Sequence, residues 1–423
     1  MNYSTLSKEE QNLAFAEIKK KYQALQREKL SLDISRGKPS SEQLDLSLPL
    51  LDMLSSNYKN PKGAGDYRNY GYLDGIPEAK ALFAELLEVS PDMVFVAGNS
   101  SLHLIYDVIS DAYCFGIQGN LPWSKTKVKF LCPVPGYDRH FAILAKFGIE
   151  MIAIPSSPNG PDMDLVEQLV QDPEVKGIIC VPRFGNPDGG IYSDETVERL
   201  ANMKVGASDF RIYWDNAYFI HEFYPDSPKL KNIFDACKTA GNIDRVIEFA
   251  STSKITFPGA GVAVIVMGEN NMKEFKKNAF VRTISYNKLN QYAHVLFLKD
   301  SETVKSIMAK HAEMLKPRFD TLEKALEESF SDCDYVDWTI PKGGYFVSLN
   351  VMQGTAKRVV ELCKNAGLTL TPAGATYPLG IDDLDRNIRL APSCTVQEEL
   401  QIACNVLVCA IEYAILEKLT TEE

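Results

Sequence analysis

Between about residues 90 and 266 the sequence alternates short apolar runs with helical patterns, and this alternation limits the fold more than any other feature. Runs such as "MVFVAG", "KVKFLCPVP", "VKGIICVP" and "GVAVIVMG" lack the polar alternation of a strand with one exposed face. Strands of this kind are buried on both faces, and helices between them imply a mostly parallel sheet. We therefore predict an α/β fold in which such a sheet lies between helices.

The remaining sequence predicts a second, smaller domain, because 423 residues exceed the size of one hydrophobic core. A long helical stretch is expected over about residues 289–330. The part after it has an α+β pattern, with strands at "GGYFVSLNV" and "NIRLAPS" and helices at "TAKRVVELCKNAG" and from "TVQEELQ" onwards. A charged amphipathic helix is expected at the N-terminus.

Composition excludes several classes of function. A net charge of −11 argues against binding to nucleic acid or to an anionic membrane surface. The nine cysteines form no C-x-x-C pair and the five histidines no cluster, which predicts a reducing compartment and no metal site. We find no signal-peptide core and expect no stretch long and apolar enough to cross a bilayer, so the predicted location is the cytoplasm.

Polar residues follow the predicted strands, where open α/β sheets bind ligands. "VFVAGNSS" places Asn99 to Ser101 at the start of a helix, which is either an anion site or an ordinary helix cap. Asp215 ends the run "RIYWD", and Arg389 lies inside "NIRLAPS". A buried charge needs a partner, so each is either part of a ligand site or of a structural salt bridge.

Lys254 is the most informative of these residues. It stands in "EFASTSKITFPGAG", between the hydroxyls of Ser251, Thr252 and Ser253 and a Pro-Gly turn. A loop lysine is usually a solvated charge, whereas one in a hydroxyl pocket at a strand end can be a nucleophile. Together with an anion cradle, an acid for a ring nitrogen and an unpaired arginine, such a lysine is what pyridoxal phosphate chemistry requires.

With these motifs in this order, the chain resembles the class I aminotransferases of fold type I, most closely their divergent aspartate aminotransferase-like subgroup. The likeness runs from about Leu32 to Leu400. It implies a large cofactor domain, residues 49–295, with a sheet of the seven-stranded type between helices. The N-terminal segment 1–48 would join residues 296–423 in a small α+β domain.

The resemblance also implies roles for individual residues. Lys254 would form the Schiff base with pyridoxal 5'-phosphate and move the proton at the substrate Cα, and Asp215 would hold the pyridine nitrogen. The cofactor hydroxyl would be bonded by Tyr218 of "WDNAYF" and Asn186 of "GNPDGG". In "PVPGYDRHF", Tyr137 would stack on the ring and His140 would orient Asp215.

The implied phosphate site is Gly98, Asn99 and Ser100 with Ser251 and Ser253. Tyr70 of "RNYGYLDG" matches a tyrosine that reaches the phosphate of the neighbouring subunit, which implies at least a homodimer. Many family members carry an arginine eight residues after the lysine, where this chain has Val262. Lys288 is the predicted replacement.

Arg389 matches the arginine that clamps the substrate α-carboxylate, beside Asn186. An acidic substrate needs a second cation. The candidates are Arg282 in "FVRTISYNKLNQ" and Arg36 in "SRGKPS", beside Gly37, and either could instead be a surface or phosphate-compensating charge. We predict a transaminase for aspartate and 2-oxoglutarate.

Four alternative functions compete with this prediction, and the sequence argues against the last two. The first two are an aminotransferase for neutral or aromatic amino acids and a lyase or decarboxylase on the same fold. A non-enzymatic regulator would need a DNA-binding domain, which the roughly 30 residues ahead of "LDISRGKPS" cannot hold. A dinucleotide-binding oxidoreductase rests only on "GAGVAVI", where the glycines precede a strand instead of opening a helix.

Overall fold

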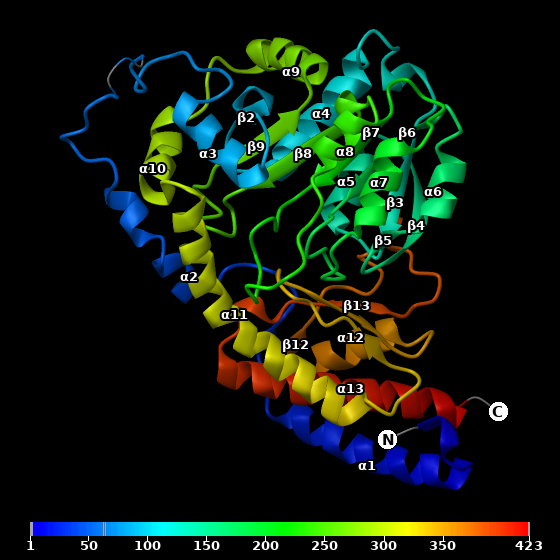
Figure 1. Ribbon diagram of the computed structural model, residues 1–423. Coiled ribbons are helices and arrows are strands. Elements are labelled where there is room, and N and C mark those ends of the chain that lie inside the picture. The colour runs from blue at the N-terminus through cyan, green and yellow to red at the C-terminus, as the bar shows by residue number, and fades with distance from the viewer. Residues whose placement is uncertain (1–2, 62, 64, 422–423) are drawn as a thin grey trace.

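A mixed sheet organises the upper lobe of the computed structural model, which describes residues 3–61, 63 and 65–421 (Figure 1). Its strand order is β2-β9-β8-β7-β6-β3-β4-β5, and β8, β7, β6, β3 and β4 run parallel. The antiparallel strands are β2 and β9 at one edge and the two-residue β5 at the other. The bounds are β2 Val94–Val96, β3 Lys129–Val134, β4 Glu150–Ser157, β5 Gly160–Pro161, β6 Val175–Cys180, β7 Arg211–Asp215, β8 Val246–Ser251 and β9 Ala263–Met267. The predicted seven-stranded type of sheet is confirmed, with β5 as a short addition.

Helices cover both faces of this sheet, which explains why its strands are apolar throughout. Neighbouring residues of β7 enter two different cores: Trp214 packs on one face and Tyr213 on the other. Burial on both faces makes a polar side chain costly in a strand, so one that occurs there, such as Glu248 in the middle of β8, needs a hydrogen-bond partner. The helices on the first face are α3 Pro77–Leu87, α6 Met163–Leu169, α7 Asp194–Asn202 and α8 Ile233–Thr239, and those on the second are α4 Ser101–Phe115, α5 Asp138–Lys146 and α9 Glu269–Arg282.

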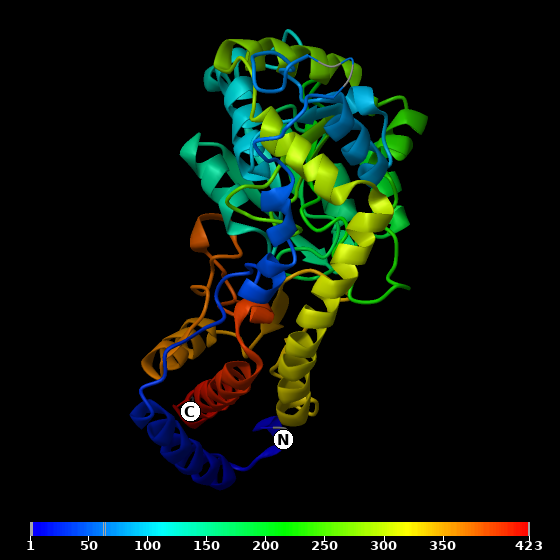
Figure 2. The same cartoon turned by 90° about the vertical axis from the view of Figure 1, so that its left-hand side faces the viewer.

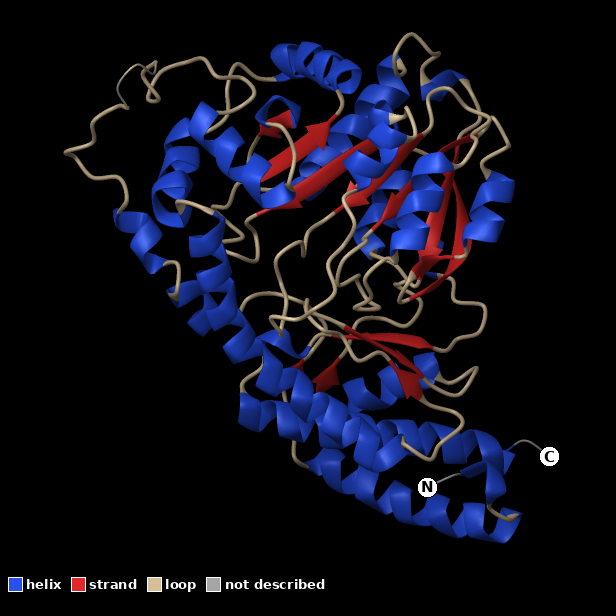
Figure 3. Cartoon of the chain, viewed as in Figure 1, coloured by secondary structure: helices blue, strands red, loops and turns tan. Residues whose placement is uncertain are grey.

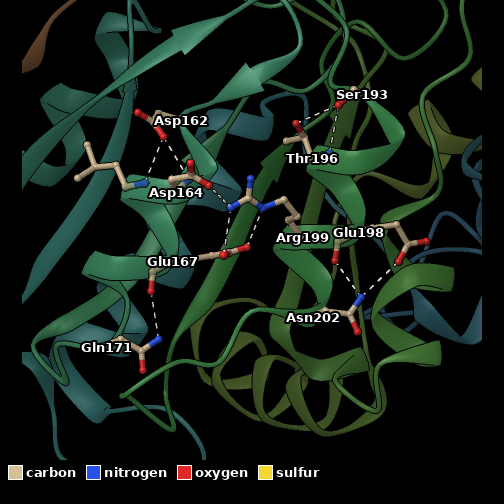
Figure 4. A network of polar contacts seen from close by, with 10 residues as sticks. Asp162, Asp164, Glu167, Gln171, Ser193, Thr196, Glu198, Arg199 and Asn202 are labelled. Atoms are coloured by element: carbon tan, nitrogen blue, oxygen red, sulfur yellow. Dashed lines mark hydrogen bonds and ion pairs between the residues drawn. The ribbon is translucent and has the colours of Figure 1, made fainter.

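Polar contacts join the outer helices α6 and α7 (Figure 4). Arg199 of α7 pairs with Asp164 and Glu167 of α6. Each helix begins at a side-chain cap, since Asp162 accepts from the backbone N–H of Leu165 and Ser193 from that of Thr196. These partly exposed pairs each contribute about 1 kcal/mol or less, so apolar packing against the sheet is what mainly holds the helices.

The lower lobe is built from both ends of the chain (Figure 3). One sheet has the order β10-β11-β13 and is antiparallel, and a second pairs β1 with β12 in parallel. The strands are β1 Leu32–Asp33, β10 Asp337–Trp338, β11 Val347–Asn350, β12 Leu368–Thr369 and β13 Asn387–Leu390. The helices are α1 Lys8–Arg27, α2 Ser41–Asp45, α12 Ala356–Asn365 and α13 Gln397–Thr421. The α+β pattern is thus confirmed, while the boundaries 48/49 and 295/296 stay predictions.

Two helices occupy the stretch where the sequence predicts one over residues 289–330. They are α10, Lys288–Leu298, and α11, Ser301–Phe330, which descends from the upper lobe to the lower (Figure 1). The break lies at Lys299, whose φ of 59° ends the first helix. Asp300 then caps the second by accepting from the N–H of Thr303 at 2.8 Å.

Helix α13 corrects the expectation that no stretch could cross a bilayer. It has 25 residues, and its most apolar window of 18 residues has a mean hydropathy of 1.6, so it is long and apolar enough by length and composition. However, 72% of its most apolar window is buried inside the protein, where it packs on α1, α11 and α12. Its composition is therefore explained by its place in the core of the lower lobe.

Candidate active site

Lys254 lies in the turn that follows β8. The carbonyl of Thr252 accepts from the N–H groups of Ile255 and Thr256, both at 2.9 Å, so the turn is closed by backbone bonds. The Lys254 Nζ is 4.9 Å from the centre of the Tyr218 ring and 5.9 Å from that of Tyr345. Burial lowers the pKa of Lys254, and the charge of Asp215 opposes this. A lysine with a lowered pKa is more often an uncharged, nucleophilic amine at neutral pH.

Asp215 ends strand β7 and is 4% exposed. Its Oδ2 accepts from His140 Nε2 at 2.8 Å, as the predicted orienting role requires. Its Oδ1 is buried and has no hydrogen-bond partner among the described residues. A buried carboxylate oxygen without a partner is costly, so this atom fits a ligand that brings an N–H group, such as a protonated pyridine.

Tyr137 lies on the other side of His140, with the two ring centres 4.9 Å apart. Burial raises its pKa to about 12, and the charge of Asp215 adds to this effect. Tyr218 is 3% exposed, and burial followed by the charge of Tyr137 raises its pKa well above the usual range. Both phenols therefore stay protonated and can donate to a cofactor oxygen.

The predicted phosphate residues meet at the start of α4. Ser100 caps this helix by accepting from the N–H of His103 at 3.3 Å. Ser253 Oγ donates to the Asn99 carbonyl at 3.3 Å and accepts from Ser251 Oγ at 3.0 Å. Hydroxyls beside a helix N-terminus are suited to an anion.

Val262 leaves this cradle without the family's arginine. It is 1% exposed, and its N–H donates to Thr252 Oγ1 at 2.9 Å. Nearby, Asn290 of α10 donates to the carbonyls of Ala260 and Gly261. The same helix begins with Lys288, which is 4% exposed and donates to Ser285 Oγ at 3.1 Å. Burial lowers its pKa, and within the described residues it has no acidic partner.

Arg389 comes from β13 of the lower lobe and reaches the upper one. Its Nη1 donates to Asp138 Oδ1 at 2.8 Å and to Asn186 Oδ1 at 3.2 Å. Its Nε is buried and unpaired in the part of the chain that the structure describes. The guanidinium thus has an unpaired donor, Nε, for a substrate carboxylate, while Nη1 is fixed by Asp138 and Asn186.

Gly37 is tied to this arginine through Phe346. A Cβ on Gly37 would lie 2.4 Å from Phe346 Cζ, so no other residue fits there without displacing the ring. The Phe346 ring centre is 5.1 Å from Arg389 Cζ. Arg36, the neighbour of Gly37, is exposed and has no ion pair among the described residues.

Two predicted residues lie apart from this group within a single chain. Arg282 is the last residue of α9, and its Nη1 is 3.2 Å from Asp107 Oδ1 and 3.5 Å from Asp111 Oδ2. Tyr70 is 76% exposed. The structure therefore does not bring either of them to Lys254 of the same chain.

Three residues of the site were not predicted: Asp138 beside Arg389, and Tyr345 and Phe346 beside Lys254 and Arg389. All three stand in quoted motifs, "PVPGYDRHF" and "GGYFVSLNV". The two glycines of the second motif could have indicated that this segment packs closely against another part of the chain. In the structure Gly343 and Gly344 both pack against Phe184.

Of the two cavities compared with the predicted site, only the smaller is lined by residues of that site. A small one of about 20 Å³ is lined by Tyr137, His140 and Asn186. A larger one of about 730 Å³ is lined by Trp214, Asn216 and other residues, none of which belongs to the predicted site. Because Asn216 and Asp215 are adjacent in the chain and only Asp215 faces His140, the larger cavity is not the cofactor site.

Comparison with known proteins gives one consistent family. The family model described as "Aspartate amino-transferase" matches residues 6–423. An aspartate aminotransferase of Corynebacterium glutamicum is 44% identical over 406 residues, 94% of each chain. The crystal structure of an aspartate transaminase from that species superimposes with a TM-score of 0.96 at 43% identity, covering 99% of both chains.

A more distant structure shares the fold. The α-aminoadipate aminotransferase of Thermus thermophilus, complexed with N-(5'-phosphopyridoxyl)-L-leucine, has a TM-score of 0.74 at 21% identity, over 92% of this chain and 93% of that one. The family model and the 44% identical relative confirm the expectation of a pyridoxal-phosphate transaminase of fold type I, against the lyase, regulator and oxidoreductase alternatives. The chain belongs to the aspartate aminotransferase family of pyridoxal-phosphate-dependent transaminases.

Proposed function

We propose that this transaminase moves the amino group of aspartate to 2-oxoglutarate, with pyridoxal 5'-phosphate held by Lys254, Asp215 and the cradle at the start of α4. The observation that carries the cofactor site is the buried Asp215 Oδ1 without a partner, next to the lysine whose pKa is lowered. When bound, the cofactor supplies an aldehyde that reacts with amines and a ring that accepts electrons from the substrate Cα.

The residues of the chain bind and orient around that group. Asp215 would favour a proton on the ring nitrogen, and His140 holds the carboxylate in place through the bond to Oδ2. Tyr218 and Asn186 would donate to the cofactor hydroxyl, and Tyr137 would stack on the ring. Lys254 takes the proton from the substrate Cα and returns it, which an uncharged amine can do.

Aspartate as the amino donor is supported by the name of the relative and by the two arginines. Arg389 binds the α-carboxylate through its unpaired Nε side. For the distal carboxylate the geometry favours Arg36. Its neighbour Gly37 packs against Phe346, whose ring lies beside Arg389, and Arg36 has no ion pair among the described residues. Arg282 already faces Asp107 and Asp111, so it would have to exchange partners to bind a substrate.

The test is a specificity ratio. Arg36→Leu should lower kcat/KM for aspartate by about 10- to 150-fold, the equivalent of about 1.5–3 kcal/mol for a charge-assisted pair, and spare alanine. Arg282→Leu is the matched control and should leave the aspartate-to-alanine ratio near that of the wild type. The reverse result would assign the distal carboxylate to Arg282. A wild type that prefers alanine or an aromatic amino acid would refute an acidic substrate.

We further propose that Lys288 replaces the arginine missing at Val262. A cofactor phosphate carries about −1.5 to −2 charges and needs compensation. Lys288 is buried and begins α10, whose Asn290 donates to the carbonyls of Ala260 and Gly261 just before Val262. Lys288→Met should raise the dissociation constant of pyridoxal phosphate from the apoprotein about tenfold or more, measured by fluorescence titration. Binding of pyridoxal, which lacks the phosphate, is the control and should be unchanged. Equal loss for both compounds would count against a phosphate role.

The functional unit is proposed to be a cytoplasmic homodimer. Apolar side chains are exposed on segments that lie on one side of the upper lobe and face the viewer in Figure 2. These exposed residues are Leu48, Leu51, Tyr70, Phe280, Val281 and Ile284. Apolar groups of this number on one side are typical of an interface and are consistent with Tyr70 reaching a neighbouring subunit.

A further inference from the structure

Three of the five histidines surround the turn that carries Lys254. His221, His294 and His311 are each no more than 2% exposed. They come from separate elements: the loop after β7, α10 and α11. A buried imidazole needs hydrogen-bond partners or it destabilises the fold, so this convergence requires an explanation.

The burial of His294 and His311 is explained by their contacts around the turn. His294 Nδ1 is 2.8 Å from the Asn290 carbonyl oxygen, which can only accept, so Nε2 carries the lone pair that faces Thr256 Oγ1 at 3.0 Å. His311 Nδ1 accepts from Gln43 Nε2 at 2.9 Å. Its Nε2 is near the Ile255 carbonyl but makes no hydrogen bond of normal geometry among the described residues. Burial lowers the pKa of His311 to about 4. Both rings are neutral and lie against residues 255 and 256.

His221 has no such explanation. Both of its ring nitrogens are buried and lack a hydrogen-bond partner among the described residues. The ring centre lies 5.6 Å from that of Tyr218 and 5.9 Å from that of Tyr345. The same two rings lie against the Lys254 Nζ, so His221 and the lysine amine share one aromatic enclosure.

The electrostatics of this enclosure keep the ring uncharged. Burial first, and then the charge of Lys254, lower the pKa of His221 to about 3. The backbone carbonyls of Lys254 and Tyr218 oppose this shift. A neutral imidazole has one N–H, which these carbonyls favour, and one lone pair, which still lacks a donor.

We propose that His221 is a positioning residue whose lone pair accepts a hydrogen bond from the amine of Lys254 while that amine is not bonded to the cofactor. The two groups are not hydrogen-bonded as they stand, so the bond forms only when the flexible lysine side chain turns toward the ring. A neutral acceptor fixes the direction of the amine without adding a charge that would repel it. The inference rests on the proposed role of Lys254.

The test measures the pKa of the Lys254 amine in the apoprotein. Acetic anhydride labels uncharged amines, and mass spectrometry of the Lys254 peptide over a pH series gives the midpoint. An acceptor favours the charged amine, so His221→Phe should lower the midpoint by about one unit, tenfold in the equilibrium. His221→Gln, whose amide oxygen also accepts, should keep it near the wild-type value. Exposed Lys324 is the internal control in the same digests.

Each outcome decides the proposal. A midpoint that does not move in His221→Phe, or that moves equally in Phe and Gln variants, overturns it. Should His221→Phe not fold, ¹⁵N-histidine NMR of the apoprotein replaces it. The His221 ring signals must then differ between wild type and Lys254→Ala, and identical signals or a charged ring at pH 7 overturn the inference. Borohydride fixation of the cofactor on wild-type Lys254 is the separate check: its absence refutes the proposed function itself.

Discussion

Lys254→Ala should leave a folded protein that binds pyridoxal phosphate but turns over about 10⁴-fold or more slowly, because general acid–base catalysis alone contributes about 10²–10⁴. The variant loses both the amine that bonds to the cofactor and the base at the substrate Cα. The cradle of Ser100, Ser251 and Ser253 is unchanged, so the cofactor should still bind through its phosphate.

Three measurements check this expectation. Coupled assays give kcat for aspartate with 2-oxoglutarate, and thermal unfolding confirms that the variant is folded. Borohydride reduction followed by mass spectrometry should find cofactor on Lys254 of the wild type and none on the variant. Lys288→Met is the matched lysine control, since it should weaken cofactor binding and still allow fixation. Normal turnover in Lys254→Ala would show that another group does the chemistry.

Lys254 and Asp215 could be predicted because they break a strong pattern. A polar side chain is costly in a strand buried on both faces, so an aspartate after "RIYW" and a lysine after "EFASTS" stand out. The order of helices and strands follows from the same patterning. The break at Lys299 was missed although the polar residues 299–303 interrupt the apolar spacing, because a continuous helix also carries polar residues on its exposed face and the backbone conformation of Lys299 is not visible in the sequence.

Contacts between residues far apart in the chain could not be predicted from the sequence. The pairing of Arg389 with Asp138 joins residues 251 positions apart, and which acid an arginine meets depends on how the lobes pack. The apolar helix α13 shows the converse case. Its composition alone fits a membrane span, and only its packing on α1 and α11 identifies it as a core helix.

His221 shows a further limit. A histidine three residues after Tyr218 in "AYFIHEF" looks like any loop histidine, and no motif marks it. Its distinguishing property, two buried nitrogens without partners beside Lys254, exists only in three dimensions.

Asp215→Asn is expected to lower kcat by about 10²- to 10⁴-fold with the cofactor still bound, which corresponds to the 3–5 kcal/mol lost when one partner of a buried charge pair is removed. The hydrogen bonds explain why the substitution lowers kcat. His140 donates to Oδ2, so the asparagine oxygen will take that place and its NH₂ group will face the ring nitrogen. A donor there favours the unprotonated ring, which accepts electrons poorly, whereas Oδ1 of the aspartate favours the protonated one.

A rescue experiment tests whether the charge of Asp215 sustains turnover. A cofactor methylated on the ring nitrogen carries a permanent positive charge, so it should restore much of the activity of Asp215→Asn while doing nothing for Lys254→Ala. Asp215→Glu keeps the charge and should retain more activity than Asp215→Asn with the normal cofactor. Equal activity in the Asn and Glu variants, or no rescue by the methylated cofactor, would mean that the negative charge of Asp215 is not what sustains turnover. The unpartnered Oδ1 would then need a different ligand group.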